Sequence, residues 1–223
     1  MAMELADGIW WFDLTGVNAY LFEDDEDATL IDAGGPWTRG ALLDQLDDVG
    51  VRPRDVSRIA LTHYDLDHVG VLSRFGTDVT VYAGQPDAAV LRGERDPPWN
   101  NRKTAVQRAS RFLIPELEQP VETVTDGDRI GGLGVYGTPG HTPGHLAFVS
   151  EERSVAFVGD LVRESGGRLE ASPWALSHDT DAVKASIRRL VELDLDVEVL
   201  AMGHGTPFVE RGAGHLSDLA GRL

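Results

Sequence analysis

Short apolar runs alternate with polar turns along the chain, and their spacing predicts a mixture of strands and helices. Apolar positions recur at helical spacing over residues 37–49 and 181–193, which predicts two amphipathic helices. Asp179 or Thr180 is expected to cap the second helix, and residues 212–223 are expected to form a short terminal helix. Apolar runs bounded by Gly, Pro or Asp predict strands at residues 9–14, 18–23, 28–32, 57–62, 79–82, 134–138, 145–149, 155–158 and 197–201.

These strands and helices follow one another in a similar order in both halves of the chain. Such an order is typical of two sheets enclosed between helices. No internal repeat, low-complexity segment or long linker interrupts it. We therefore expect one α/β domain over residues 1–223, folded as a four-layer αββα sandwich.

The composition is that of a globular protein rather than a disordered or membrane-spanning one. Of the 223 residues, 42% are hydrophobic and 26% are charged, and no apolar run approaches the roughly 20 residues that cross a bilayer. Cysteine is absent, which excludes disulfides, thiolate nucleophiles and Cys-ligated metals. The N-terminal residues lack the pattern of a secretory signal peptide. We expect a cytoplasmic protein with no membrane partner.

The charge is strongly negative, with 37 acidic residues against 20 basic ones and a formal charge of −17. Net charge of this size repels itself in dilute salt, and molar salt screens the repulsion. We therefore interpret the chain as a cytosolic protein of a salt-accumulating organism. The alternative is an acidic enzyme from a GC-rich genome, in which codon bias favours Arg over Lys. Both interpretations disfavour non-specific nucleic-acid binding over the whole surface.

Residues 92–111 reverse this balance, because bases outnumber acids there. We predict that residues 92–119 form a lid or flap near the active site. Arg102, Lys103 and Arg108 are the candidate contacts to an anionic substrate, since Arg offers a fork that binds carboxylate or phosphate with two hydrogen bonds. The alternative is that these bases pair with acids elsewhere on the surface.

Five of the seven histidines lie in three short clusters beside Gly, Thr or Asp at predicted strand ends. In an extended loop, residues i and i+2 point the same way, so His63, Asp65 and Asp67 can converge. Tyr64 and Leu66 would then point into the fold. Imidazole and carboxylate groups buried this close together are costly without a cation, and a divalent metal is the simplest explanation.

The other two clusters are built on tight turns. Residues 138–145 read Thr-Pro-Gly-His-Thr-Pro-Gly-His, and residues 203–207 read Gly-His-Gly-Thr-Pro. Gly and Pro fix sharp turns, from which a histidine can project into a cleft. Between the two clusters an apolar strand ends at Gly159 and Asp160, which places one carboxylate where it could bridge two metals.

The chain resembles the metallo-β-lactamase superfamily from about residue 17 to residue 207. It carries four elements in the superfamily's order: His-x-Asp-x-Asp-His, Gly-His-Thr-Pro-Gly-His, Gly-Asp after a strand, and Gly-His-Gly-x-Pro. The second element is most similar to that of glyoxalase II-type hydrolases. The resemblance implies an αββα sandwich with a binuclear metal site along one edge of the sheets.

The resemblance also implies roles for individual residues. Asp32 would support the metal ligands, and we expect His145 to hold its turn by a hydrogen bond rather than to bind metal. The implied ligands are His63, Asp65 and His141 for the first metal, Asp67, His68 and His204 for the second, and Asp160 as the bridge between them.

Asp65 departs from the pattern, because most hydrolases of this superfamily have His at that position. A carboxylate makes the site harder and more negative, so manganese or iron becomes an alternative to zinc, which we otherwise favour. Redox-active diiron members of the superfamily carry an acid at the same place. Those members normally append a flavin domain, for which 223 residues leave no room.

Hydrolysis is the function that the resemblance favours. A hydroxide bridging two divalent metals would attack a small ester, thioester or lactone, expected to be anionic, and Asp67 would orient it or shuttle a proton. The sequence has neither Cys nor a Gly-x-Ser-x-Gly elbow, which fits a mechanism without a covalent nucleophile. The alternatives are a nuclease or phosphodiesterase using the basic residues 92–111, a diiron redox protein, and a binding module without activity. The sequence does not determine the oligomeric state, and a dimer is plausible.

Overall fold

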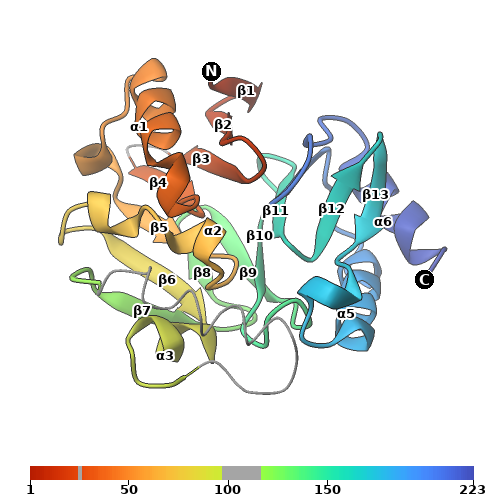
Figure 1. The fold of residues 1–223 in the computed structure, drawn as a ribbon. Helices are drawn as coiled ribbons and strands as arrows, with labels where there is room; N and C mark the ends of the chain where they lie inside the picture. Colours follow the sequence, from red (N-terminus) through yellow and green to blue (C-terminus); the bar gives the residue numbers. More distant parts are fainter. Residues whose placement is uncertain (25–26, 97–116) are drawn as a thin grey trace.

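Two β-sheets lie face to face in the computed structural model, which describes residues 1–24, 27–96 and 117–223 (Figure 1). Within this described part, the first sheet has seven strands in chain order: β1 (Met3–Ala6), β2 (Ile9–Asp13), β3 (Asn18–Asp24), β4 (Asp27–Ile31), β5 (Arg58–Ala60), β6 (Thr80–Gly84) and β7 (Val121–Val124). The second has five, in the spatial order β14 (Val199–Met202), β11 (Val155–Gly159), β10 (Leu146–Ser150), β9 (Leu133–Gly137) and β8 (Arg129–Ile130).

Helices cover the outer face of each sheet (Figure 1). The first sheet carries α1 (Arg39–Asp48), α2 (Leu66–Val69) and α3 (Asp87–Leu91), and the second carries α5 (Thr180–Glu192) and α6 (Gly212–Ala220). The αββα order predicted from the sequence is therefore confirmed. Among the described residues, no helix combines the length and apolar character needed to cross a bilayer.

The alternation of side chains along the central strands builds three apolar layers. In β3, Leu21 packs toward the helices of the first sheet, whereas Tyr20 and Phe22 pack between the sheets. In β11, Phe157 packs between the sheets and Val158 packs toward α5 and α6. Because both faces of each sheet are covered, these strands read in the sequence as continuous apolar runs.

The two sheets are tied together along the edge that carries the histidine clusters. The Asn18 backbone N–H donates to the Gly203 carbonyl (2.8 Å), and the Tyr20 hydroxyl donates to the Met202 carbonyl (2.7 Å). On the other side of this edge, the Leu146 N–H donates to the Thr62 carbonyl (2.8 Å). These hydrogen bonds fix the strand ends of one sheet against those of the other.

Each predicted helix is present, with small shifts at its ends. The predicted helix 37–49 begins with the 3₁₀ turn η1 (Pro36–Thr38) before α1. Asp179 is the cap of α5, because its carboxylate accepts the N–H groups of Asp181 and Ala182. The terminal helix α6 ends at Ala220.

Sequence analysis did not predict the hairpin of β12 (Val162–Ser165) and β13 (Arg168–Ala171) that follows β11. Its strands are short and mostly polar, so they carry no apolar run. The signal was in the turn: Gly166 and Gly167 have φ of 59° and 79°, and a Gly-Gly pair in the left-handed region is typical of a two-residue hairpin turn.

The predicted lid at residues 92–119 falls largely outside the described residues, and so do Arg102, Lys103 and Arg108. At its described start, Arg92 pairs with Glu94 (2.9 Å) and donates to the Val121 carbonyl and the Thr123 hydroxyl. These contacts concern Arg92 alone, and the roles of Arg102, Lys103 and Arg108 stay predictions.

Candidate metal centre

The candidate site forms at an edge where four strands end. β4 ends just before Asp32 and β5 just before Thr62 and His63. These strands are parallel neighbours, so their carboxyl ends meet at one edge of the sheet. β11 and β14 are also parallel, and they end beside Asp160 and His204.

The first cluster of ligand-type atoms consists of His63, Asp65 and His141, all within 4.8 Å of one another. Oδ2 of Asp65 lies 3.3 Å from Nε2 of His63 and 3.1 Å from Nε2 of His141. His63 and Asp65 therefore project to the same side, as their spacing predicts. Tyr64 is buried as expected. Leu66 begins α2 and is only half-buried, which corrects the expectation that it points into the fold.

The second cluster consists of Asp67, His68 and His204. Oδ2 of Asp67 lies 3.5 Å from Nε2 of His204 and 4.0 Å from Nε2 of His68. Because α2 begins at Leu66, the extended spacing stops there and Asp67 turns toward His204 instead of joining the cluster of His63. The convergence of all three loop residues, expected from spacing alone, is therefore wrong for Asp67.

Asp160 lies between the two clusters. Its Oδ2 lies 3.1 Å from Nε2 of His204 and 3.5 Å from Nε2 of His141, and its Oδ1 lies 3.5 Å from Nε2 of His68. One carboxylate thus faces histidines of both clusters. This is the position predicted for it from the Gly-Asp motif.

In each of the four cluster histidines, Nδ1 lies within hydrogen-bond distance of a polar group outside the cluster. Nδ1 of His68 donates to the Asp32 carboxylate (2.8 Å), and Nδ1 of His204 donates to the Gly16 carbonyl (2.5 Å). These two partners can only accept, so the proton lies on Nδ1 and Nε2 of each ring is directed at the carboxylates. In the first cluster, Nδ1 of His63 and of His141 lie 2.9 Å and 2.8 Å from the hydroxyls of Thr62 and Ser172.

The carboxylates dominate the electrostatics of the site. Burial alone would lower the pKa of His68, but Asp32, Asp160 and Asp67 outweigh it and raise the pKa to about 10. Burial of His204 is outweighed in the same way, chiefly by Asp160, and its pKa rises to about 9. Burial would raise the pKa of Asp160, yet the surrounding imidazoles hold it well below its usual range. The site therefore attracts cations strongly.

The donor set fits divalent metal ions. Nε2 of His63, Nε2 of His68 and Oδ1 of Asp160 are buried and have no hydrogen-bond partner among the described residues, which is costly unless a cation binds them. Ligand atoms about 2.0–2.1 Å from a tetrahedral zinc lie about 3.3 Å from each other. The nitrogen–oxygen separations around Asp65 and Asp160 span that value.

Comparison with known proteins identifies the family of the chain. The model of the metallo-beta-lactamase superfamily matches residues 12–204. The chain belongs to the metallo-beta-lactamase superfamily. The uncharacterized protein YobT of Bacillus subtilis is 31% identical over 202 residues, which cover 85% of this chain and 83% of YobT.

Two further relatives are informative. Hydroxyacylglutathione hydrolase GloC of Haemophilus influenzae is 28% identical over 199 residues, covering 83% of this chain and 84% of GloC. The crystal structure of TTHA1623 in a di-iron-bound form matches with a TM-score of 0.70 at 30% identity, covering 93% of this chain and 95% of that one. The superfamily comprises metal-dependent hydrolases that bind divalent metals, often two.

Asp32 and His145 are the residues that the superfamily resemblance places behind the ligands. Asp32 has φ of 58°, in the left-handed region that Asp tolerates better than most residues. Its carboxylate accepts the backbone N–H and the hydroxyl of Thr62 as well as Nδ1 of His68. Nδ1 of His145 lies 2.8 Å from the Thr138 hydroxyl, and His145 belongs to none of the ligand clusters found among the described residues.

Several contacts of this superfamily site were not predicted from the sequence. Ser172 and the Gly16 carbonyl contact the candidate ligands His141 and His204 from segments far away in the chain. Glu164 ties the β12–β13 hairpin to the loop of His204: its N–H donates to the His204 carbonyl (3.1 Å), and its carboxylate accepts the Thr206 N–H (3.0 Å). Such contacts leave no local pattern, so spacing alone could not reveal them.

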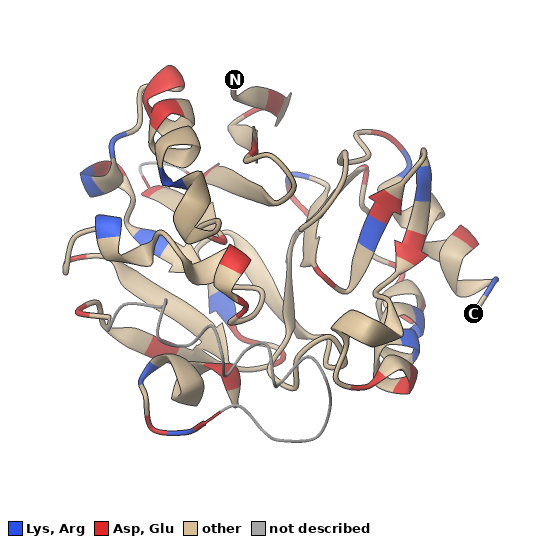
Figure 2. Cartoon of the chain, viewed as in Figure 1, with Lys and Arg blue, Asp and Glu red and all other residues tan. Residues whose placement is uncertain are grey.

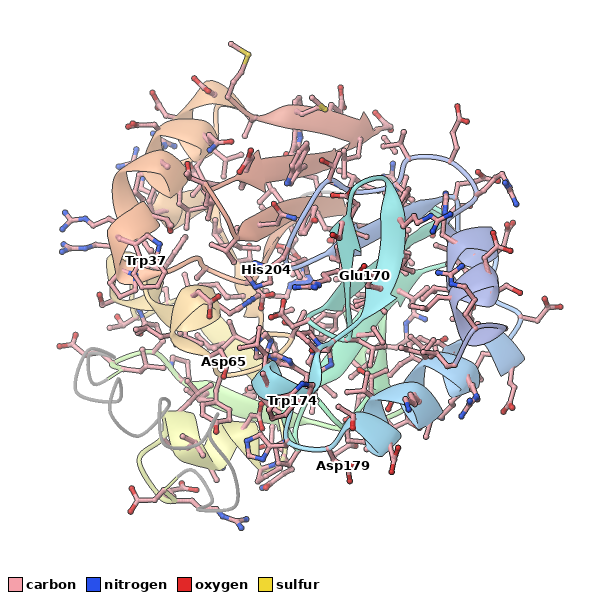
Figure 3. All side chains as sticks on the ribbon, turned by 45° about the vertical axis from the view of Figure 1, so that its right-hand side comes forward. Trp37, Asp65, Glu170, Trp174, Asp179 and His204 are labelled. Atoms are coloured by element: carbon pink, nitrogen blue, oxygen red, sulfur yellow. The ribbon has the colours of Figure 1, made fainter. Side chains whose placement is uncertain are left out.

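A cavity of about 300 Å³ opens beside the candidate metal centre. Two exposed tryptophans, Trp37 and Trp174, flank the site, with Asp65 and His204 between them in the view of Figure 3. Trp174 begins the 3₁₀ turn η5 (Trp174–Leu176), and Leu176 is also exposed. The cavity is lined by Asp160, Val162, Arg163, Glu164, Ser165, Ser172, Pro173, Leu176 and His204.

Proposed function

We propose that the protein is a hydrolase of small acyl compounds that uses two divalent metal ions. The observation that carries the proposal is the position of Asp160, whose carboxylate lies 3.1–3.5 Å from Nε2 of three histidines drawn from both clusters. The proposed ligands are His63, Asp65 and His141 for one ion, Asp67, His68 and His204 for the other, and Asp160 for both.

The metal ions would supply Lewis acidity, which lowers the pKa of bound water toward neutrality. The hydrolysis itself forms a bond from the water oxygen to the carbonyl carbon and breaks the bond from that carbon to the leaving oxygen or sulfur. One proton passes from water to the leaving group. Asp67 is partly exposed, with its Oδ2 3.5 Å from Nε2 of His204, and we assign it the transfer of this proton and the orientation of the attacking water.

Relatives support acyl hydrolysis as the reaction class. GloC is a hydroxyacylglutathione hydrolase by name, and hydrolysis of an ester, thioester or lactone requires no residue that this chain lacks. A phosphodiesterase or nuclease remains the first alternative, but its support comes from basic residues 92–111, most of which lie outside the described residues. The diiron redox alternative draws its support from Asp65 and from the di-iron form of TTHA1623.

Zinc is the metal that we favour, with manganese or iron as alternatives because of Asp65. Carboxylate oxygen is a harder ligand than imidazole and suits manganese and iron better. Replacing Asp65 with His should therefore raise the share of zinc in protein exposed to equal amounts of zinc, manganese and iron. An unchanged metal distribution would show that Asp65 does not determine metal choice.

The deciding experiment combines metal analysis with a substrate screen. Protein purified in about 2 M KCl, where charge repulsion is screened, is analysed for bound metals and assayed with a phenyl ester, a thioester, a lactone and a phosphodiester, before and after EDTA. We expect about two metals per chain and acyl hydrolysis that EDTA abolishes and added metal restores.

Matched variants make this test specific. His63→Ala should lose metal and acyl hydrolysis, whereas His215→Ala should keep both, because His215 stacks on Phe208 and belongs to no ligand cluster among the described residues. Hydrolysis that survives EDTA would contradict the proposal. Faster cleavage of the phosphodiester than of any acyl substrate would favour the nuclease, and iron-loaded protein without hydrolysis would favour the redox protein.

A further inference from the structure

Arg163 is the only Lys or Arg in the described lining of the cavity beside the candidate metal centre. It lies on β12, three residues after Asp160. One side of the cavity is formed by Asp160 and His204, so Arg163 and the candidate metal centre share one space. Arg168 lies on the same hairpin, is exposed, and does not line the cavity.

The guanidinium of Arg163 has few acceptors. Its Nη2 donates to Oε2 of Glu170 (3.0 Å), which is its only side-chain partner among the described residues. Its Nε is buried and has no partner there. A guanidinium offers five N–H donors in a fixed fork, and the described residues provide an acceptor for only a part of them. The Nε at the base of the fork is thus covered by protein, while the side chain as a whole is 42% exposed.

Glu170 faces Arg163 directly across the hairpin, since the two residues are register partners of β12 and β13. Both side chains are close to half exposed. An ion pair this exposed is weak, typically about 0–1 kcal/mol, so a second anion can compete for the guanidinium. In the view of Figure 3, Glu170 lies on the hairpin, on the side of the molecule that also shows His204 and Trp174.

We propose that Arg163 binds a carboxylate of the substrate, at the end of the acyl part away from the scissile bond, and that Glu170 competes for the same guanidinium. This inference rests on the proposed acyl hydrolase function. Pro173, Leu176 and Val162 give the same cavity an apolar lining, which suits the methylene chain of a dicarboxylic acid monoester or monothioester. The substrate class is thus an acyl compound with a second, free acid group.

A purely structural ion pair between Arg163 and Glu170 makes a different prediction. If the pair only stabilises the hairpin, loss of either partner should harm every substrate to the same degree. If Glu170 competes with substrate, removal of its charge should strengthen binding of the acid substrate, whereas removal of Arg163 should weaken it. The two variants therefore shift the preference for acid substrates in opposite directions.

The test uses the metal-loaded enzyme and two matched series of 4-nitrophenyl esters. One series comprises the monoesters of adipic, pimelic and suberic acids, and the other comprises the fatty acid esters of equal chain length, in which a methyl group replaces the carboxylate. For the best chain length, Arg163→Met should lower the acid-to-neutral ratio of kcat/KM about 10- to 100-fold, mainly through KM. Arg163→Lys should lower it less, because Lys keeps the charge but loses the fork.

Glu170→Gln should raise the same ratio several-fold, and Arg168→Met, which removes the same charge from the same hairpin, should leave it unchanged. A readout without turnover is the rise in melting temperature caused by free dicarboxylate over that caused by the matching monocarboxylate. This excess should disappear in Arg163→Met at equal metal content.

Two failures are distinguishable. If the wild-type enzyme hydrolyses the neutral esters but all variants keep its acid-to-neutral ratio, the role of Arg163 is wrong and the hydrolase function stands. A fall of the ratio in Glu170→Gln would equally overturn the role, because it would assign the pair to hairpin structure. If the wild-type enzyme hydrolyses neither series, and neither the thioester nor the lactone of the substrate screen, the proposed function itself is wrong.

Discussion

Gly203 lies directly against Asp160, so that a Cβ built on Gly203 would overlap Oδ1 of the Asp160 carboxylate. The same Cβ would lie 2.8 Å from Cε1 of His68. The glycine before His204 is therefore needed for space, because two candidate ligands from other segments pack against its Cα.

From this contact we predict that Gly203→Ala weakens metal binding about 10- to 100-fold, the range typical of disturbed supports around a metal. Metal content after dialysis, measured with far-UV circular dichroism on the same sample, checks the prediction. Gly40→Ala is the control, because a Cβ on Gly40 in α1 meets nothing within 4 Å. Full metal content in Gly203→Ala would show that Asp160 can move aside without consequence.

We predict that Asp160 contributes to the binding of more than one metal ion. Because its two oxygens face histidines of both clusters, Asp160→Ala is expected to lose more than one equivalent of metal per chain. Mass spectrometry of metals against protein concentration measures this directly. An Asp160→Ala variant that keeps both ions would remove the bridging role.

We predict the opposite outcome, retention of metal, for His145→Ala. Nδ1 of His145 is within hydrogen-bond distance of the Thr138 hydroxyl, so we expect its loss to disturb the 138–145 turn while metal content is retained. The cost should appear as a lower free energy of unfolding, of about 1–3 kcal/mol for a buried polar contact. Loss of one whole metal equivalent would instead identify His145 as a ligand.

The sequence was most informative where function depends on local spacing. The turn at 138–145, the Gly-Asp at the end of β11 and the loop at 62–68 each carry their chemistry within a few residues, and the structure brings their side chains together at one edge. The αββα order followed from apolar runs, because strands buried on both faces leave a strong pattern.

Arg163 shows why other parts of the site could not be predicted. A single Arg on a short polar strand does not stand out in the sequence. The run of bases at residues 92–111 does, and sequence analysis therefore placed the predicted substrate contacts there. The place of Arg163 in the cavity depends on the β12–β13 hairpin folding back beside the loop of His204. Contacts of this kind join segments that are distant in sequence, so composition and periodicity do not reveal them.

Asp87 should make stability depend on pH. It is fully buried, and its carboxylate accepts hydrogen bonds from the Thr142 hydroxyl (2.6 Å) and the Gly144 N–H (2.9 Å). Burial raises the pKa of Asp87 to about 6, with these hydrogen bonds and His63 opposing the rise and Asp65 adding to it. In the unfolded chain the carboxyl titrates near about 3.9, so folding favours its protonated form.

The stability contributed by Asp87 is therefore complete below about pH 3.9 and is lost as pH rises through about 6. Asp87→Asn keeps an acceptor for the Gly144 N–H and can donate to the Thr142 hydroxyl. In EDTA, the free energy of unfolding of the wild type should fall by about 2 kcal/mol relative to this variant between about pH 4 and 7. Urea titrations at several pH values measure the difference.

Asp126→Asn provides a control, because the stability contributed by Asp126 should depend on pH in the opposite direction. Burial would raise the pKa of Asp126, but hydrogen bonds from Arg189 and from the Gly137 N–H outweigh it and lower the pKa. Its contribution to stability is present above the pKa of the unfolded chain and is lost as pH falls. Parallel curves for the wild type and Asp87→Asn would show that Asp87 does not titrate as its burial requires.

Salt should stabilise the protein strongly at low ionic strength. With a formal charge of −17, repulsion acts over a Debye length of about 30 Å at 0.01 M salt but only about 3 Å at 1 M. The melting temperature should therefore rise steeply with KCl, most of all below about 0.5 M, where the Debye length changes most. A melting temperature that is flat from about 0.1 to 2 M would remove the proposal that the chain is adapted to high salt.

A variant on α1 separates screening from the general effect of molar salt on apolar burial. Asp44, Asp47 and Asp48 are exposed on this helix, whose outer end is acidic in Figure 2. Asp47 and Asp48 also lie at its C-terminus, where the helix dipole disfavours negative charge. Replacing all three with Asn should raise the melting temperature in dilute buffer and flatten its dependence on KCl, because three sources of repulsion are gone. In about 2 M KCl the variant and the wild type should melt together if screening is the cause. An equal gain at every KCl concentration would assign the effect to local helix stability instead.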